Sequence, residues 1–258
     1  MYWFACDCAG TRSERNLLTR RRSYKQLYHK YLSMLRLASR RIAARARRRV
    51  HAPAHALLPR HKTGRTLYDE MRDLTKAGGD FTVHNYAAVL EDLSEDATTV
   101  ETELFPSAAL DFYTRWNLEE AVTDAEVAAF KTPERGGAQG DYRLGMRKKI
   151  ANAVDCLQTH SNSKRASIPI PFATEGSESV DWRDAGQTKC CRELYLYVEG
   201  GRLSCTGILR VQNASIFPKN MHFFGALLRH VASELGLPLG VYTHNVASLC
   251  HDRSATNC

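Results

Sequence analysis

Apolar residues recur at three- and four-residue intervals in much of the chain, and this spacing is typical of amphipathic helices. It predicts a long helix over residues 23–50 and shorter helices over residues 66–76, 84–93, 108–116, 123–130 and 142–159. A last helix is expected from Asn220 to Leu235, with Phe223, Leu227 and Val231 facing inward and Gly236 ending it.

Runs rich in β-branched and aromatic residues predict strands over residues 166–172, 192–198 and 202–211. The last two flank Gly200-Gly201 and form a hairpin, because glycine tolerates the positive φ of a tight turn. Residues 136–140 are expected to form a loop. The pattern predicts an α+β fold, in which helices cover one side of a sheet of mainly long strands.

Charge divides the chain at about residue 65. Residues 1–65 contain 17 Lys or Arg and two acidic residues, whereas residues 66–258 contain 19 basic and 26 acidic residues. We therefore expect an Arg-rich helical arm over 1–65 and a mildly acidic globular domain over 66–258. No apolar run is long enough to predict a transmembrane segment.

Six arginines cluster in ten residues near the end of the predicted arm helix. Guanidinium groups donate paired hydrogen bonds to phosphates, so the first interpretation is contact with RNA or a ribonucleoprotein. An organellar transit peptide and a solvated or membrane-surface helix remain alternatives. The six are Arg40, Arg41, Arg45, Arg47, Arg48 and Arg49.

The eight cysteines are scattered along a chain too long for a small disulfide scaffold, so we expect mostly reduced thiols. Several Cys and His residues lie near the two termini, but their spacing matches no common zinc-ligand pattern. These residues are Cys6, Cys8, Cys250, His251 and Cys258. No metal site is predicted.

Several short segments between residues 100 and 252 follow an order that resembles the thymidylate synthase family. A Gly-Asp-Tyr-Arg turn precedes a helix, a basic pair enters a strand, and a cysteine precedes a strand with a glycine turn. An arginine, an asparagine and a last strand complete the order. The segments are Gly140–Arg143, Ser163–Ala166, Cys190–Cys205, Arg210, Asn220 and Gly240–His244.

The resemblance implies a role for each matching residue. Cys190 would be the nucleophile that adds to C6 of a pyrimidine nucleotide, once its pKa is lowered by a neighbour such as Arg210. Arg210 would also bind the nucleotide phosphate, and Asn220 would bind the edge of the ring. Lys164 and Arg165 would reach the phosphate of a partner subunit across a dimer interface. An active member would use methylene-tetrahydrofolate.

Several positions depart from the family pattern. Cys191 replaces a histidine, Val211 a serine and Asn213 an aspartate that contributes to nucleotide binding. The segment from Asn213 to Asn220 is one residue shorter than usual. The sugar-binding histidine and tyrosine are replaced by a cysteine and an aspartate at positions 250 and 252, and the arginine-bearing phosphate loop has no clear match.

Two functions follow from these observations. The first is a catalytically degenerate domain without a cofactor, held by its arm in a large assembly such as a mitochondrial ribosome. There it would contact other protein subunits and form a homodimer or heterodimer through the sheet. The second is an active folate-dependent methyl- or hydroxymethyl-transferase for dUMP or dCMP, with a targeting extension. Because catalytic residues act as a unit, the replacements favour the first.

Overall fold

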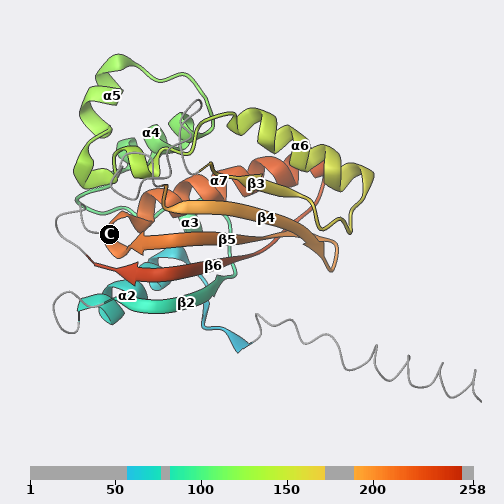
Figure 1. The fold of residues 1–258 in the computed structure, drawn as a ribbon, viewed down its shortest axis with the longest axis horizontal. Helices are drawn as coiled ribbons and strands as arrows, with labels where there is room; N and C mark the ends of the chain where they lie inside the picture. Colours follow the sequence, from blue (N-terminus) through green and yellow to red (C-terminus); the bar gives the residue numbers. More distant parts are fainter. Residues whose placement is uncertain (1–56, 77–81, 172–188, 252–258) are drawn as a thin grey trace, which may run out of the picture. The chain divides into compact units, whose positions relative to one another are not determined.

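The structure is a computed structural model that describes residues 57–76, 82–171 and 189–251. The predicted helix over 23–50 and the six arginines of the arm lie outside the described residues. So do Cys6, Cys8 and Cys258 from the zinc set that the sequence left unsupported. The described residues form a mixed sheet with helices, which confirms the predicted α+β class (Figure 1).

The sheet of the described residues has six strands in the order β1-β2-β6-β5-β4-β3. β5 is parallel to β6, and β1 is parallel to β2, whereas the other three neighbouring pairs are antiparallel. The strands are β1 (Arg60–His61), β2 (Val83–Leu90), β3 (Ser167–Pro169), β4 (Cys191–Glu199), β5 (Arg202–Asn213) and β6 (Leu239–Cys250). The predicted hairpin is the β4–β5 pair, and Gly200 and Gly201 both have positive φ.

The helices begin and end close to the predicted positions in most cases. None in the described part of the chain is long and apolar enough to cross a membrane. They are α2 (Gly64–Lys76), α3 (Glu95–Thr98), α4 (Ser107–Asn117), α5 (Asp124–Phe130), α6 (Met146–Thr159) and α7 (Phe217–Leu235). Short 3₁₀ turns span η2 (Pro133–Arg135), η3 (Ala138–Gly140) and η4 (Ala214–Ile216).

Two helix starts differ from prediction. α6 begins at Met146, after Gly145 in the left-handed region, so Tyr142 precedes the helix and packs into the core. α7 begins at Phe217, three residues earlier than predicted, because Pro218 suits the first turn of a helix. The earlier start places Lys219 and Asn220 together in the first turn of α7.

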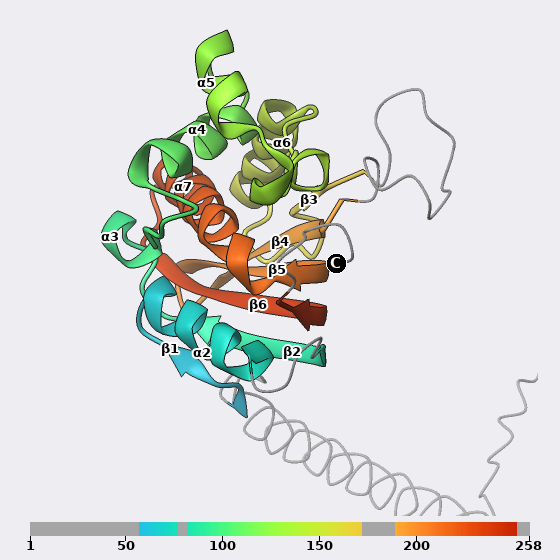
Figure 2. The same cartoon turned by 90° about the vertical axis from the view of Figure 1, so that its left-hand side faces the viewer.

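One face of the sheet packs against α2, α6 and α7. The buried side chains of these helices form a single core with alternating strand residues, and Figure 2 shows α6 and α7 over the same side of the sheet. The predicted inward residues Phe223, Leu227 and Val231 are all buried. Ile208 of β5 does not belong to this core and remains 40% exposed. The helices therefore cover one face, and the other face carries exposed apolar surface.

The predicted helix over residues 84–93 is wrong, because residues 83–90 form β2. Its alanines and leucine favoured a helix in isolation, but the segment pairs along its length with β6. Tyr86, Ala88 and Leu90 point into the main core from this strand. Strand pairing and burial thus outweighed local helix propensity.

Candidate functional site at one end of the sheet

The topology gathers residues of the predicted site at one end of the sheet. β4 is antiparallel to β5, and β5 is parallel to β6, so the start of β4 lies beside the ends of the other two strands. Cys190 immediately precedes β4, while Asn213 ends β5 opposite Cys250 of β6. Three segments that are distant in sequence therefore meet here.

Cys190 is buried in a small apolar cluster with Val211 and Cys250. Its backbone carbonyl accepts a hydrogen bond from Arg210 N at 2.9 Å, and its backbone N donates to Gln139 O at 3.2 Å. Its thiol lies 3.7 Å from Gln139 Oε1 and is 3% exposed as a residue. Val211 and Cys250 thus place apolar atoms beside the thiol.

Burial raises the pKa of the Cys190 thiol above its ordinary value, and the positive charges of Lys219, Arg210 and Lys189 offset only part of this effect. The expectation that this site lowers the thiol pKa is therefore wrong. Arg210 acts in the expected direction, but desolvation of a thiolate in this cluster is the larger effect. The adjacent Cys191 is more strongly affected, since burial raises its pKa to about 12.

The amide groups near Cys190 bind one another. Asn220 is 2% exposed and donates from Nδ2 to Gln212 Oε1 at 2.9 Å. Gln212 Nε2 donates to the carbonyl of Asn213 at 2.6 Å, and Asn213 Oδ1 accepts from Ser215 N at 2.9 Å. Asn220 thus lies at the same end of the sheet as Cys190, and its amide bonds α7 to β5.

Lys219 is a member of this site that the sequence prediction missed. It is 1% exposed, and its Nζ makes no hydrogen bond or ion pair with the residues that the structure describes. The amine lies 4.4 Å from the centroid of the Tyr113 ring and packs directly on Gly136 and Gly140. Burial lowers its pKa to about 8, although Cys190 and Asp141 act in the opposite direction.

The glycines at positions 136 and 140 leave room for the amine of Lys219. A Cβ atom added to Gly140 would lie 2.1 Å from Lys219 Nζ, and one added to Gly136 would lie 2.8 Å from it. The 136–140 segment, predicted as a loop, forms part of two 3₁₀ turns that present this glycine surface. In the sequence, this lysine stands in the segment that forms the start of α7. The structure shows that most residues of that segment are buried.

Lys164 and Arg165 lie apart from Cys190 within the chain. They occupy the exposed turn between α6 and β3, where Arg165 N donates to Ser163 Oγ at 3.2 Å. β3 runs antiparallel to β4, so this turn is near the middle and end of β4 and not its start. Their role across a dimer interface stays a prediction.

A cleft of 670 Å³ lies next to the 136–140 segment. Arg65, Arg72 and Arg135 line it together with Ser215 and His251, and Ser215 Oγ lies 3.2 Å from His251 Nδ1. The guanidinium groups are already engaged: Arg65 with the Glu101 carbonyl, Arg72 on the Tyr68 ring, and Arg135 with the Leu104 carbonyl. In the part of the chain that the structure describes, no three His, Cys, Asp or Glu side chains gather to hold a metal.

The geometry thus joins Cys190, Arg210, Asn213 and Asn220 at one end of the sheet. It adds Lys219, which no sequence pattern had singled out. In comparisons with known proteins, no family model matches the sequence and no curated protein is similar to it.

Proposed function

We propose that the chain is a catalytically inactive relative of the thymidylate synthase family that serves as a structural subunit of a large assembly. A mitochondrial ribosome or another organellar ribonucleoprotein is the assembly that best fits the basic arm. The order of motifs from Gly140 to His244 supports the relationship. The α+β class and the meeting of Cys190, Arg210 and Asn220 at one end of the sheet are consistent with it.

The environment of Cys190 is the observation that carries this proposal. A thiol adds to a conjugated carbon as the thiolate, so a nucleophilic cysteine needs access and a lowered pKa. Cys190 has neither, because Val211 and Cys250 enclose it and burial raises its pKa. Asn220, which would bind a pyrimidine ring, is hydrogen-bonded to Gln212.

The basic arm supports an anchoring role. Seventeen Lys or Arg residues against two acidic ones give residues 1–65 the charge of a nucleic-acid-binding segment. Each phosphate neutralised by such a side chain releases counterions, so binding of this kind weakens steeply as salt is added. Residues 66–258, with 19 basic and 26 acidic side chains, have no comparable attraction for RNA.

Within the described residues, the helices of the main core pack on one face of the sheet, and the opposite face, called uncovered here, supports contact with another subunit. Tyr195 and Tyr197 of β4 have stacked rings 5.9 Å apart. On β5, Thr206 pairs with Tyr195, and Ile208 pairs with Glu193. Ile208 is 40% exposed and the two tyrosines are half-buried. We propose that a second copy or another protein covers this face, as a homodimer or heterodimer.

Enzyme assays test the proposal directly. Purified full-length protein incubated with dUMP or dCMP and methylene-tetrahydrofolate should yield no methylated or hydroxymethylated product. Intact-mass measurement should show no adduct at Cys190. Turnover that Cys190→Ala abolishes, with Cys156→Ala as the matched control, would overturn the inactive assignment.

Sedimentation tests the arm. Deleting residues 1–50 should release the protein from a ribonucleoprotein fraction in a density gradient, as should replacing the six clustered arginines by glutamine. Replacement by lysine keeps the charge and should keep most of the association. If the deletion variant and the glutamine variant both sediment like the wild type, the arm does not anchor the protein. A mature N-terminus near residue 50 would identify a transit peptide instead.

The alternative is an active transferase of the same family. The convergence of Cys190, Arg210 and Asn220 favours it, as do the three positive charges that lower the thiol pKa in part. Measuring dUMP binding distinguishes the active transferase from the structural subunit. An active enzyme binds dUMP with a measurable affinity that falls when Arg210 is changed to Ala, whereas a structural subunit shows no dUMP-dependent rise in Tm.

A further inference from the structure

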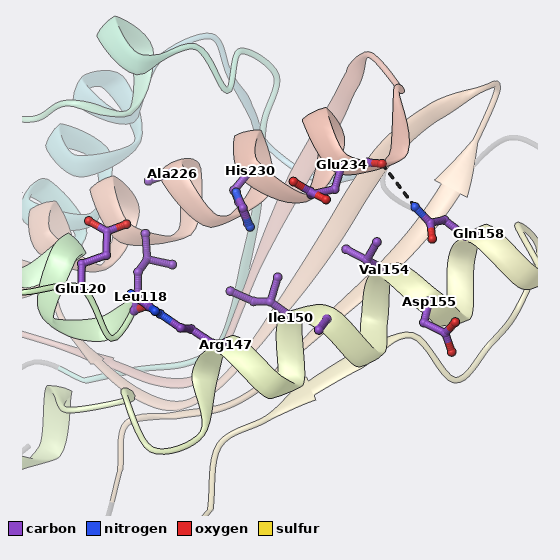
Figure 3. A pocket seen from close by; sticks show the side chains of 11 residues that line it. Leu118, Glu120, Arg147, Ile150, Val154, Asp155, Gln158, Ala226, His230 and Glu234 are labelled. Atoms are coloured by element: carbon purple, nitrogen blue, oxygen red, sulfur yellow. Dashed lines mark hydrogen bonds between the residues drawn. The ribbon is translucent and has the colours of Figure 1, made fainter.

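A groove runs between α6 and the second half of α7, away from the residues assigned above (Figure 3). Its volume is 740 Å³. Along α6 the lining residues recur every three or four positions from Arg147 to Gln158, and α7 contributes Ala226, His230 and Glu234 at intervals of four. One face of α6 therefore lines the groove over about 16 Å and one face of α7 over about 12 Å, at a rise of about 1.5 Å per residue.

The floor of the groove is apolar. Ile150 and Val154 project from α6 toward α7, and Ala226 and Leu118 border them (Figure 3). Gln158 Nε2 donates to the carbonyl of Glu234 at 3.3 Å and joins the two helices at one end. The two helices thus form a groove with an apolar floor, and a hydrogen bond joins them at one end. A groove of this shape can accept a third helix.

The rim is acidic, although the whole chain has a net charge of +8. Glu120, Asp155 and Glu234 are exposed carboxylates along the groove, and Arg147 is the only Lys or Arg among the residues that line it. Arg147 Nε lies 3.4 Å from the Leu118 carbonyl at the α4 end. The carboxylates Asp155 and Glu234 lie toward the other end of the groove, away from Arg147, and His230 is the other basic side chain of the lining.

We propose that this groove binds a basic amphipathic helix of a partner protein. An apolar ridge at three- and four-residue spacing would lie on Ile150 and Val154, and Lys or Arg side chains beside the ridge would reach Asp155 and Glu234. Charge complementarity selects the basic helix, since an acidic helix of the same apolar pattern would meet like charge. The surface is distinct from both the sheet end and the uncovered sheet face, so the protein could hold this partner while occupying its assembly.

A designed peptide tests the groove. The probe is a fluorescent 16-residue peptide with leucines at helical spacing and arginines at the other exposed positions, titrated with the full-length protein. Fluorescence anisotropy should show saturable binding, and a matched peptide with glutamate for every arginine should bind at least about tenfold more weakly. Failure of the arginine peptide to bind, or equal binding of both peptides, would overturn the proposal.

Variants locate the site. Asp155→Lys combined with Glu234→Lys should weaken the arginine peptide at least about tenfold, and Ala226→Trp should block it by filling the floor. Asp73→Lys combined with Asp96→Lys makes the same charge change at exposed positions on α2 and α3 and should have little effect. An equal loss in both double variants would mean non-specific attraction. If Ala226→Trp instead dissociates a dimer in solution, a second copy of this chain occupies the groove and the proposal fails.

Discussion

Lys219 and Asn220 are neighbours in the first turn of α7, and both are almost fully buried. Asn220 satisfies its amide by donating to Gln212, whereas the amine of Lys219 has the face of the Tyr113 ring and no hydrogen bond among the described residues. Equal burial therefore has opposite consequences. A paired amide stabilises the sheet end, while an unpaired ammonium opposes folding there.

The contrast between the hydrogen-bonded Asn220 amide and the Lys219 amine bears on the function of this end of the sheet. An unpaired buried lysine beside Cys190 costs stability that the large core must offset. Groups that cost stability often mark a functional site. They also persist as relics where the rest of the core is sufficient. Replacing Lys219 and Asn220 separately distinguishes a functional site from a relic, because stability and ligand binding can be measured on the same variants.

Lys219→Met should produce the largest change. Methionine keeps most of the side-chain length and removes the buried charge, so the free energy of unfolding at pH 7 should rise by roughly 3 kcal/mol. Urea denaturation of the full-length protein measures it, with Lys148→Met at an exposed position of α6 as the matched control. A loss of stability in Lys219→Met would show that the ammonium has a favourable partner in solution.

The advantage of Lys219→Met should depend on pH. The folded-state pKa of Lys219 is about 8, lowered from 10.5 by burial, so the unfolded chain binds the extra proton between these values. The penalty is complete below pH 8 and disappears as pH rises toward 10.5. The stability difference between Lys219→Met and wild type should therefore shrink between pH 8 and pH 10. Because the difference is taken at each pH, groups whose titration does not depend on Lys219 cancel, whereas Cys190, which interacts with Lys219, is changed to alanine in both proteins. A constant difference would contradict a buried amine with a lowered pKa.

Asn220→Ala should act in the opposite direction and by a smaller amount. It leaves Gln212 Oε1 without its donor in a buried position, which costs about 1–3 kcal/mol in the free energy of unfolding. Asn152→Ala, at an exposed position of α6, is the matched control. If dUMP raises the Tm of wild type and Asn220→Ala removes that rise, the amide binds a ligand in addition to its structural role.

Much of the architecture could be predicted from local patterns, because the β4–β5 hairpin and α4, α5 and α7 have regular spacing and clear end signals. β2 could not, since its alanines favour a helix until β6 pairs with it. Cys190, Arg210 and Asn220, which the resemblance singles out, lie at one end of the sheet, and their roles stay predictions. The raised pKa of Cys190 and the burial of Lys219 depend on contacts between segments far apart in sequence, which no local pattern contains.

The smallest effect tests the packing between Lys219 and Gly140. Gly140→Ala places a methyl group where the amine now lies, so we expect a loss of about 1–2 kcal/mol in the free energy of unfolding, limited by how far the flexible lysine end can shift. In the double variant with Lys219→Ala the methyl group meets no amine, and the loss caused by Gly140→Ala should disappear. That coupling, measured as a double-mutant cycle, is specific to contact between the two residues. If Gly140→Ala costs the same in both backgrounds, the glycine is required for the backbone of the 3₁₀ turn. In that case Lys219 does not determine the residue at position 140.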